Sequence, residues 1–273
     1  MNLKYPLKNP NIYDFEQKTN LLNPTYMETV QRNTITEHMR TVVVDWLMFV
    51  YYKFKYNPET MFLTTYVLDR FLGMTPVSMN QLQLVGAACF FIASKYEELM
   101  ASEAKDLEYL SNRAFTKADL LEAEGQILMQ LDFDVTFASS FSFLLALKEN
   151  LQLGSEVFLT AQILLEISLL DYKLIRYTQA HLAVSALYVA FVLNNGRRIW
   201  SQCNIEAATG YSEAVILPCA NDILNLFLSV CKTPEEKLVV KRKYQSHPVF
   251  SFMQRAAFSL SSSEEPASFM QSQ

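Results

Sequence analysis

The chain has 273 residues, of which 51% are hydrophobic and 19% are charged, and its formal net charge is −5. This length and apolar content allow one large hydrophobic core or two smaller ones. The negative net charge argues against nucleic acid or an anionic membrane as a partner. With only 6 glycines and 9 prolines, the sequence is poor in tight turns, so its composition favours an all-α fold.

The sequence offers no set of residues for catalysis, metal binding or cofactor binding. It contains no CxxC pair, no GxGxxG loop and no Ser/His/Asp arrangement, and its 3 histidines are isolated. The 4 cysteines have no histidine at ligand spacing, so we expect free thiols in a reduced intracellular compartment. We therefore expect no metal, no cofactor and no catalytic residue.

No part of the sequence is expected to enter a membrane. The opening, MNLKYPLKNPN, lacks the apolar segment of a secretory signal. Of the two most apolar stretches, 84–94 is too short to span a bilayer and 177–196 contains several polar side chains. Both stretches are predicted to be helices that are buried on all sides.

In chain order, residues 1–33 are expected to form a lead-in with one short helix near 11–22, and residues 246–273 a Ser-rich disordered tail. Between them, helical periodicity predicts helices near 34–56, 59–73, 79–99, 103–112, 116–131, 139–150, 154–170, 177–194, 201–209 and 212–231. Asn57, Ser102, Thr116 and Ser212 are expected to cap the helices that follow them.

The predicted helices form two related sets. The segments 115–131 and 211–227 align without gaps and share an aromatic residue, a capping hydroxyl and the spacing of their leucines and isoleucines. A helix rich in small residues precedes each segment. We therefore predict one five-helix unit that is used twice, with boundaries at 34–135 and 136–245.

Arg40 is the least expected residue of the first predicted helix. On a helical wheel it shares an apolar face with Val44 and Leu47. A buried guanidinium needs a counter-charge, and Asp69 lies in the next helix among apolar residues. We predict a buried ion pair between Arg40 and Asp69 that has a structural rather than a catalytic role.

The same helix carries a second apolar stripe, formed by Met39, Val43, Trp46 and Val50. A peripheral helix needs only one stripe that faces the core. The second stripe is therefore either buried as well or exposed as a groove for a partner.

Four long motifs in the first half resemble the cyclin box in order and spacing. They are MRTVVVDWL (39–47), YVLDRFL (66–72), LQLVGAACFFIASKYEE (82–98) and LEAEGQILMQLDFDV (121–135). The second half continues the resemblance, and its DYKLIRY segment (171–177) is closer to B-type than to A-type mitotic cyclins. The resemblance covers about residues 11–245 and implies tandem five-helix cyclin-fold repeats.

This resemblance implies a regulatory subunit, not an enzyme, that binds and activates a cyclin-dependent protein kinase as a 1:1 heterodimer in G2/M-type progression. It also implies a location in the nucleus and cytoplasm. Five positions that characterise the first repeat of the family are present: Arg40, Asp69, Leu84, Lys95 and Glu124.

In the family, the residues that match Lys95 and Glu124 hold the kinase at the segment that leads into its αC helix. The residues that match the apolar surface for that helix are Ile92, Tyr96, Leu128, Phe133 and Val135.

The second stripe matches a further feature of the family, a docking patch for substrates and inhibitors with an Arg-x-Leu-like motif. Its matching residues are Met39, Val43, Trp46 and Gln83. Phe49 stands where the family usually has a glutamate for the basic residue of the motif, and Val43 replaces a more usual leucine. We expect apolar docking to persist with weaker selectivity for arginine.

Three other interpretations remain open from the sequence. Lys95 and Glu124 could form a salt bridge that serves no partner. The tandem repeat could grip DNA, as in transcription-associated relatives, although the net charge of −5 argues against it. The chain could also be a scaffold that no longer activates a kinase, but the presence of Lys95 and Glu124 argues against that.

Overall fold

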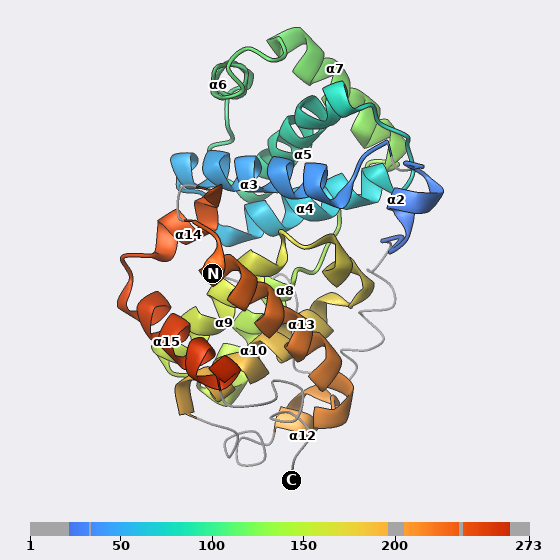
Figure 1. Cartoon of the computed structure of the whole chain (residues 1–273). Helices are drawn as coiled ribbons and strands as arrows, with labels where there is room; N and C mark the ends of the chain where they lie inside the picture. The colour runs from blue at the N-terminus through green and yellow to red at the C-terminus, as the bar shows by residue number, and fades with distance from the viewer. Residues whose placement is uncertain (1–21, 33, 196–204, 235–236, 263–273) are drawn as a thin grey trace. The chain divides into compact units, whose positions relative to one another are not determined.

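The computed structural model describes residues 22–32, 34–195, 205–234 and 237–262, and every regular element in these ranges is a helix (Figure 1). Contacts within the chain define two compact units. Leu21–Ser139 and Leu169–Arg176 form the N-terminal unit, and Ser140–Ser168 with the chain from Tyr177 onward forms the C-terminal unit. Apart from its last residue, the lead-in helix expected near 11–22 lies outside the described residues.

The central helix of the N-terminal unit is α5 (Leu82–Glu97), which packs against α3, α4 and α7. The other helices of this unit are α2 (Tyr26–Thr29), α3 (Glu37–Phe54), α4 (Pro58–Leu72), η1 (Met79–Gln81), α6 (Ala104–Leu110), α7 (Lys117–Gln130) and η2 (Tyr172–Arg176). Residues 85–94 are all buried. This confirms the prediction of a helix that is buried on all sides.

Side-chain caps fix the starts of three of these helices. The hydroxyl of Thr36 accepts a hydrogen bond from the backbone N–H of Met39 at the start of α3. The side chain of Asn57 accepts a hydrogen bond from the backbone N–H of Glu59 at the start of α4. Thr116 and Asp119 form a reciprocal capping box at the start of α7. The predicted caps at Asn57 and Thr116 are thus confirmed, whereas Ser212 occupies the N-cap position of α13 without a side-chain hydrogen bond. The predicted cap at Ser102 is wrong, because Glu103 occupies the N-cap position of α6 and the Ser102 hydroxyl pairs with that of Ser94.

Helices α3 and α5 approach each other closely at Gly86. A Cβ atom at this position would lie 2.8 Å from Cγ1 of Val43 and 3.3 Å from Cδ1 of Leu47. Glycine therefore lets α3 lie directly against the middle of α5. This contact buries Val43, one member of the second apolar stripe.

The central helix of the C-terminal unit is α10 (Gln179–Asn195), which packs against α8, α9, α13 and α15. The other helices of this unit are α8 (Ser140–Leu151), α9 (Ser155–Ser168), α12 (Ile205–Thr209), α13 (Glu213–Lys232), α14 (Val239–Tyr244) and α15 (Pro248–Ser262). Residues 182–191 are all buried, so this stretch is a core helix, as predicted.

By length and composition alone, α13 could cross a membrane, since it has 20 mostly apolar residues. However, Pro218 and Asp222 interrupt its apolar sequence. Its buried residues include Ile216, Ile223 and Phe227, and the helix packs against α9, α10 and α15. These contacts are those of a core helix within the C-terminal unit.

The prediction of a disordered tail from residue 246 onward is wrong for residues 248–262, which form α15. Phe250, Met253 and Ala257 are fully buried and recur at helical spacing. The high serine content of this segment hid that period when only composition was considered. The remainder of the tail lies outside the described residues.

A second correction concerns residues 169–176, which were assigned to the C-terminal repeat. In the structure they belong to the N-terminal unit. Leu169 and Leu170 end the predicted helix 154–170, whereas the observed α9 stops at Ser168. The backbone of this segment accepts hydrogen bonds from α3 instead of continuing the helix.

Candidate functional site

Lys95 lies in the last turn of α5 and Glu124 in the middle of α7, and their side chains form an ion pair. Nζ of Lys95 donates to Oε1 of Glu124 at 2.8 Å and to Oε2 at 2.9 Å. The side chain of Lys95 is 45% exposed and that of Glu124 is 13% exposed. Lys95 Nζ also lies 3.8 Å from the ring centroid of Phe91, a cation–π contact. The structure thus brings the two predicted kinase-binding charges together at the surface.

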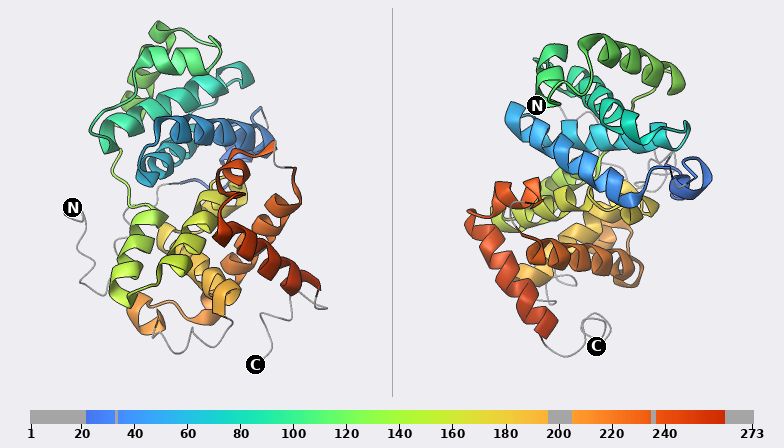
Figure 2. Two further views of the ribbon diagram at one scale, coloured as in Figure 1. Left: turned by 90° about the vertical axis from the view of Figure 1, so that its left-hand side faces the viewer. Right: turned by 45° about the horizontal axis from the view of Figure 1, so that its top comes forward.

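The sequence of α7 explains why Glu124 points toward Lys95. Leu120, Ala123 and Ile127 form the buried face of α7, and this helix packs against α5. At its start, the carboxylate of Asp119 accepts hydrogen bonds from the backbone N–H and the hydroxyl of Thr116, and these bonds lower the pKa of Asp119. In both views of Figure 2, α7 (green) runs along the edge of its unit.

The five apolar residues predicted to surround this pair differ in exposure. Ile92 and Val135 are buried, Leu128 is half-buried, and Tyr96 and Phe133 are exposed. Tyr96, Leu128 and Phe133 can therefore contact a partner directly. Ile92 and Val135 support the surface from beneath.

Phe133 is held outward by a strained turn after α7. Asp132 and Phe133 have φ values of 53° and 54°, in the left-handed region, which costs a non-glycine residue about 1–2 kcal/mol. The backbone N–H of Phe133 donates to the carbonyl of Leu128 at 2.8 Å, and Phe133 is 68% exposed. The turn after α7 therefore leaves Phe133 at the surface.

Sequence reasoning missed a second exposed apolar segment, formed by Leu99 and Met100 after the end of α5. Glu98 anchors this segment, because its carboxylate accepts from the backbone N–H of Asn57 at 2.8 Å and from the Thr60 hydroxyl. The Met100 carbonyl accepts from the hydroxyl of Tyr56 at 3.1 Å. Two large apolar residues directly after a buried helix were the signal that could have indicated this surface.

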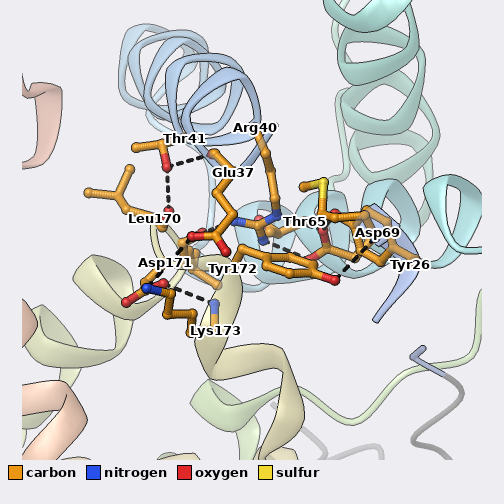
Figure 3. A network of polar contacts seen from close by, with 12 residues as sticks. Tyr26, Glu37, Arg40, Thr41, Thr65, Asp69, Leu170, Asp171, Tyr172 and Lys173 are labelled. Atoms are coloured by element: carbon orange, nitrogen blue, oxygen red, sulfur yellow. Dashed lines mark hydrogen bonds and ion pairs between the residues drawn. The ribbon is translucent and has the colours of Figure 1, made fainter. Parts of the chain in front are cut away.

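Arg40 and Asp69 lie at the centre of a buried polar network (Figure 3). Nε and Nη2 of Arg40 donate to Oδ1 and Oδ2 of Asp69, both at 2.7 Å. The hydroxyl of Tyr26 donates to Oδ1 of Asp69 at 2.8 Å. Burial lowers the pKa of Arg40, but the charge of Asp69, the hydrogen bonds to its carboxylate and the contact with Tyr26 together outweigh this effect, and the net shift is upward. Burial and the same carboxylate raise the pKa of Tyr26 well above its usual value.

The network extends to residues 169–176 of the same unit. Nη1 of Arg40 donates to the carbonyl of Leu169 at 2.9 Å. The hydroxyl of Tyr172 donates to the carbonyl of Pro24 at 2.8 Å and accepts from the N–H of Met27 at 3.2 Å. Four segments, α2, α3, α4 and η2, are thereby joined around one ion pair. Sequence reasoning missed Tyr26 and Tyr172.

The four predicted docking residues do not share one degree of exposure. Met39, Trp46 and Gln83 are half-buried, whereas Val43 is buried against α5. Phe49 is exposed on the same helix. The second stripe is thus divided between the core of the unit and its surface.

The described residues offer little for metal or thiol chemistry. Among them, no group of three or more His, Cys, Asp or Glu side chains could hold a metal ion. Cys89, Cys219 and Cys231 are buried. Burial raises the pKa of Cys231 to about 11, so this thiol stays protonated and unreactive at neutral pH. Cys203 lies outside the described residues.

Two family models together match nearly the whole chain. The model of the cyclin N-terminal domain matches residues 10–136, and the model of the cyclin C-terminal domain matches residues 138–260. The chain therefore belongs to the cyclin family.

Its curated relatives include B-type and G2/mitotic-specific cyclins. The chain is 34% identical over 239 residues to Cyclin-B2-2 of Oryza sativa subsp. indica, covering 86% of this chain and 56% of that protein. It is 32% identical over 250 residues to G2/mitotic-specific cyclin-2 of Medicago sativa, covering 91% and 72%. It is 36% identical over 225 residues to G2/mitotic-specific cyclin-B2 of Oryzias javanicus, covering 82% and 58%. These matches confirm the resemblance to B-type mitotic cyclins; the chain spans little more than half the length of most of them.

Solved structures confirm the tandem cyclin fold. The X-ray structure of a viral cyclin from herpesvirus saimiri has a TM-score of 0.64 at 20% identity, covering 91% of this chain and 98% of that chain. The structure of the yeast RNA Pol II CTD kinase CTDK-1 complex contains a chain with a TM-score of 0.58 at 16% identity, covering 79% and 76%.

Proposed function

We propose that this chain is a regulatory subunit that binds a cyclin-dependent protein kinase as a 1:1 heterodimer, activates it and controls G2/M-type progression. In this proposal the chain is not itself an enzyme, and the chemistry belongs to the kinase. The observation that carries the proposal is the surface ion pair of Lys95 and Glu124 in a member of the cyclin family. Exposed Tyr96 follows Lys95 directly in the sequence, and exposed Phe133 follows the end of α7.

The ion pair can hold a partner without being broken. The ammonium group of Lys95 has three donors, of which two point to Glu124. A carboxylate has about four acceptor positions, so Glu124 also keeps acceptor capacity. One donor and one acceptor side by side fit the carbonyl and N–H groups of a partner's backbone.

Activation would follow from differential binding. An active kinase needs the glutamate of its αC helix paired with the lysine of its third strand. A regulatory subunit that binds this arrangement better than the inactive one shifts the equilibrium toward it. The exposed apolar residues around the ion pair would supply that difference in affinity.

The first experiment removes the ion pair. We expect the double variant Lys95→Ala/Glu124→Ala to lose at least about 2 kcal/mol of binding free energy for the kinase. Both side chains that would bind the kinase backbone are removed, and the backbone groups would be left unpaired in the interface. Capture of purified cyclin-dependent kinases and phosphorylation of a histone-type substrate measure this. Lys117→Ala/Glu122→Ala, with the same charge changes elsewhere on α7, is the control. Equal capture by both double variants and wild type would contradict the proposal, whereas retention of DNA would support a transcription-associated role.

We also propose that Met39, Val43, Trp46 and Gln83 mark a docking patch for substrates or inhibitors with an Arg-x-Leu-like motif. Exposed Phe49 beside half-buried Trp46 favours apolar contacts over recognition of a basic residue. Because Val43 is buried against α5, it would shape the patch from beneath.

Peptide selectivity tests this patch. We expect Arg-x-Leu and Ala-x-Leu peptides to bind with affinities that differ by less than about threefold. The reason is that Phe49 stands where a carboxylate would be needed to bind the arginine. Fluorescence titration measures both affinities, and Phe49→Glu serves as the matched variant that should restore a preference for arginine. A strong preference for Arg-x-Leu in wild type would contradict this expectation.

The same proposal includes a location in the nucleus and cytoplasm. Imaging of the tagged chain through the cell cycle tests it, and exclusion from the nucleus at every stage would overturn it.

A further inference from the structure

Gly125 stands in the middle of α7, directly after Glu124, and has no structural need to be a glycine. A Cβ atom built at this position meets no atom within 4 Å, in contrast to Gly86, where a Cβ would press on Val43. Glycine is among the poorest residues for a helix interior. The contacts of this chain therefore do not explain why a weak helix former occupies the site.

The neighbours of Gly125 on the helix are large, apolar and accessible. Leu121, one turn before it, is 42% exposed, and Met129, one turn after it, is 65% exposed. Leu128 lies half-buried between them. The row from Leu121 to Met129 is thus an apolar ridge with one side chain missing at its centre.

Such a gap is suited to another helix. Helices pack by placing the ridge of one into a groove of the other, and the distance between their axes depends on the side chains at the crossing. A glycine at the crossing allows the closest approach of a partner's backbone. The ion pair of Lys95 and Glu124 stands beside the gap, so a helix seated there would also reach the spare donor and acceptor of that pair.

We propose that Gly125 is the point of closest approach for a helix of the partner kinase, and that the missing side chain sets how near this helix lies to α7. The inference rests on the proposed function, because the occupant is the kinase that Lys95 and Glu124 would hold. It assigns to Gly125 a role in partner specificity: a kinase whose helix presents a small side chain at the crossing can lie closest to α7.

The test compares the effect of a side chain at Gly125 on the stability of the free chain with its effect on kinase binding, because the two should be opposite. Gly125→Ala should raise the melting temperature of the free chain by about 2–4 °C, because alanine is the better helix former and meets open space. Gly125→Leu should likewise leave the free chain folded. Yet Gly125→Leu should weaken capture of a purified cyclin-dependent kinase by at least about tenfold, and Gly125→Ala by less, as measured by calorimetry on the full chain.

Gln126→Leu is the matched control, because it adds the same side chain to an exposed position about 100° further round α7. It should leave kinase affinity within about twofold of wild type. Unchanged affinity of Gly125→Leu, or an equal loss in Gln126→Leu, would overturn the inference while leaving the proposed function intact. If wild type binds no kinase, the proposed function fails first.

Discussion

The charge of Arg40 is tolerated in the core because acceptors surround its guanidinium. The residue is 1% exposed, and two carboxylate oxygens of Asp69 and the carbonyl of Leu169 accept its hydrogen bonds. A buried pair of this kind adds little net stability compared with apolar residues, but removing one partner leaves an uncompensated charge. The pair therefore matters most for the arrangement that it enforces.

We predict that Asp69→Asn destabilises the chain by about 3–5 kcal/mol, since it keeps the shape of the side chain and removes the counter-charge of Arg40. Denaturant unfolding measures the loss. Asp134→Asn is the control, because Asp134 is half exposed and lies 3.8 Å from Arg70 in a surface ion pair, which contributes about 0–1 kcal/mol. Equal free energies of unfolding for the two variants would show that the buried ion pair contributes no more to stability than the surface pair.

At the scale of single residues, the sequence predicted the ion pair of Arg40 and Asp69 but not the two tyrosines around it. A helical wheel is sufficient to place Arg40 on an apolar face, and a single acidic residue in the next apolar helix indicates its counter-charge. Tyr26 and Tyr172 are separated by 146 positions of sequence numbering, yet their rings meet edge to face at 5.0 Å. They lie in very short helices with no usable period, so only the tertiary structure brings them together.

At the scale of elements, periodicity predicted the long helices and failed where composition dominated. The buried residues of α5 and α10 form continuous apolar runs, which indicate core helices directly. In α15, Ser251 and exposed Phe252 lie between buried Phe250 and Met253, and exposed Phe258 and further serines follow buried Ala257. Composition alone therefore did not distinguish its apolar face from a low-complexity tail. The ring of Phe250 nonetheless lies 5.9 Å from that of Phe227 of α13, at an angle of 90°.

We predict that Phe250→Ala costs about 3–5 kcal/mol, because this side chain is fully buried and its removal leaves a cavity. Phe252→Ala, two positions along the same helix at an exposed site, should cost less than about 1 kcal/mol. Thermal or denaturant unfolding compares the two variants. Equal losses would mean that α15 packs differently from the structure.

At the scale of the whole chain, the two structural units are not two consecutive segments of the sequence. Two repeats were predicted as consecutive segments, but residues 169–176 belong to the N-terminal unit although they follow α9. No local pattern could reveal this, because the segment is bound mainly through its backbone carbonyls and Tyr172. Leu169 and Leu170 offer carbonyls to Arg40 and Thr41, and any residue could supply those acceptors.

We predict that Tyr172→Ala loosens the N-terminal unit without affecting the core of the C-terminal unit. The substitution removes two hydrogen bonds to the segment around α2 and the ring contact with Tyr26, so α2 should open locally more often. Amide hydrogen exchange of the full chain should show faster exchange in α2 and the start of α3, with α10 unchanged. Lys173→Ala is the control, because Lys173 is exposed and only 3.9 Å from Glu37 in a surface pair. Faster exchange spread equally over both units would mean that they unfold as one cooperative body, whereas unchanged exchange in α2 would remove Tyr172 from the network that holds it.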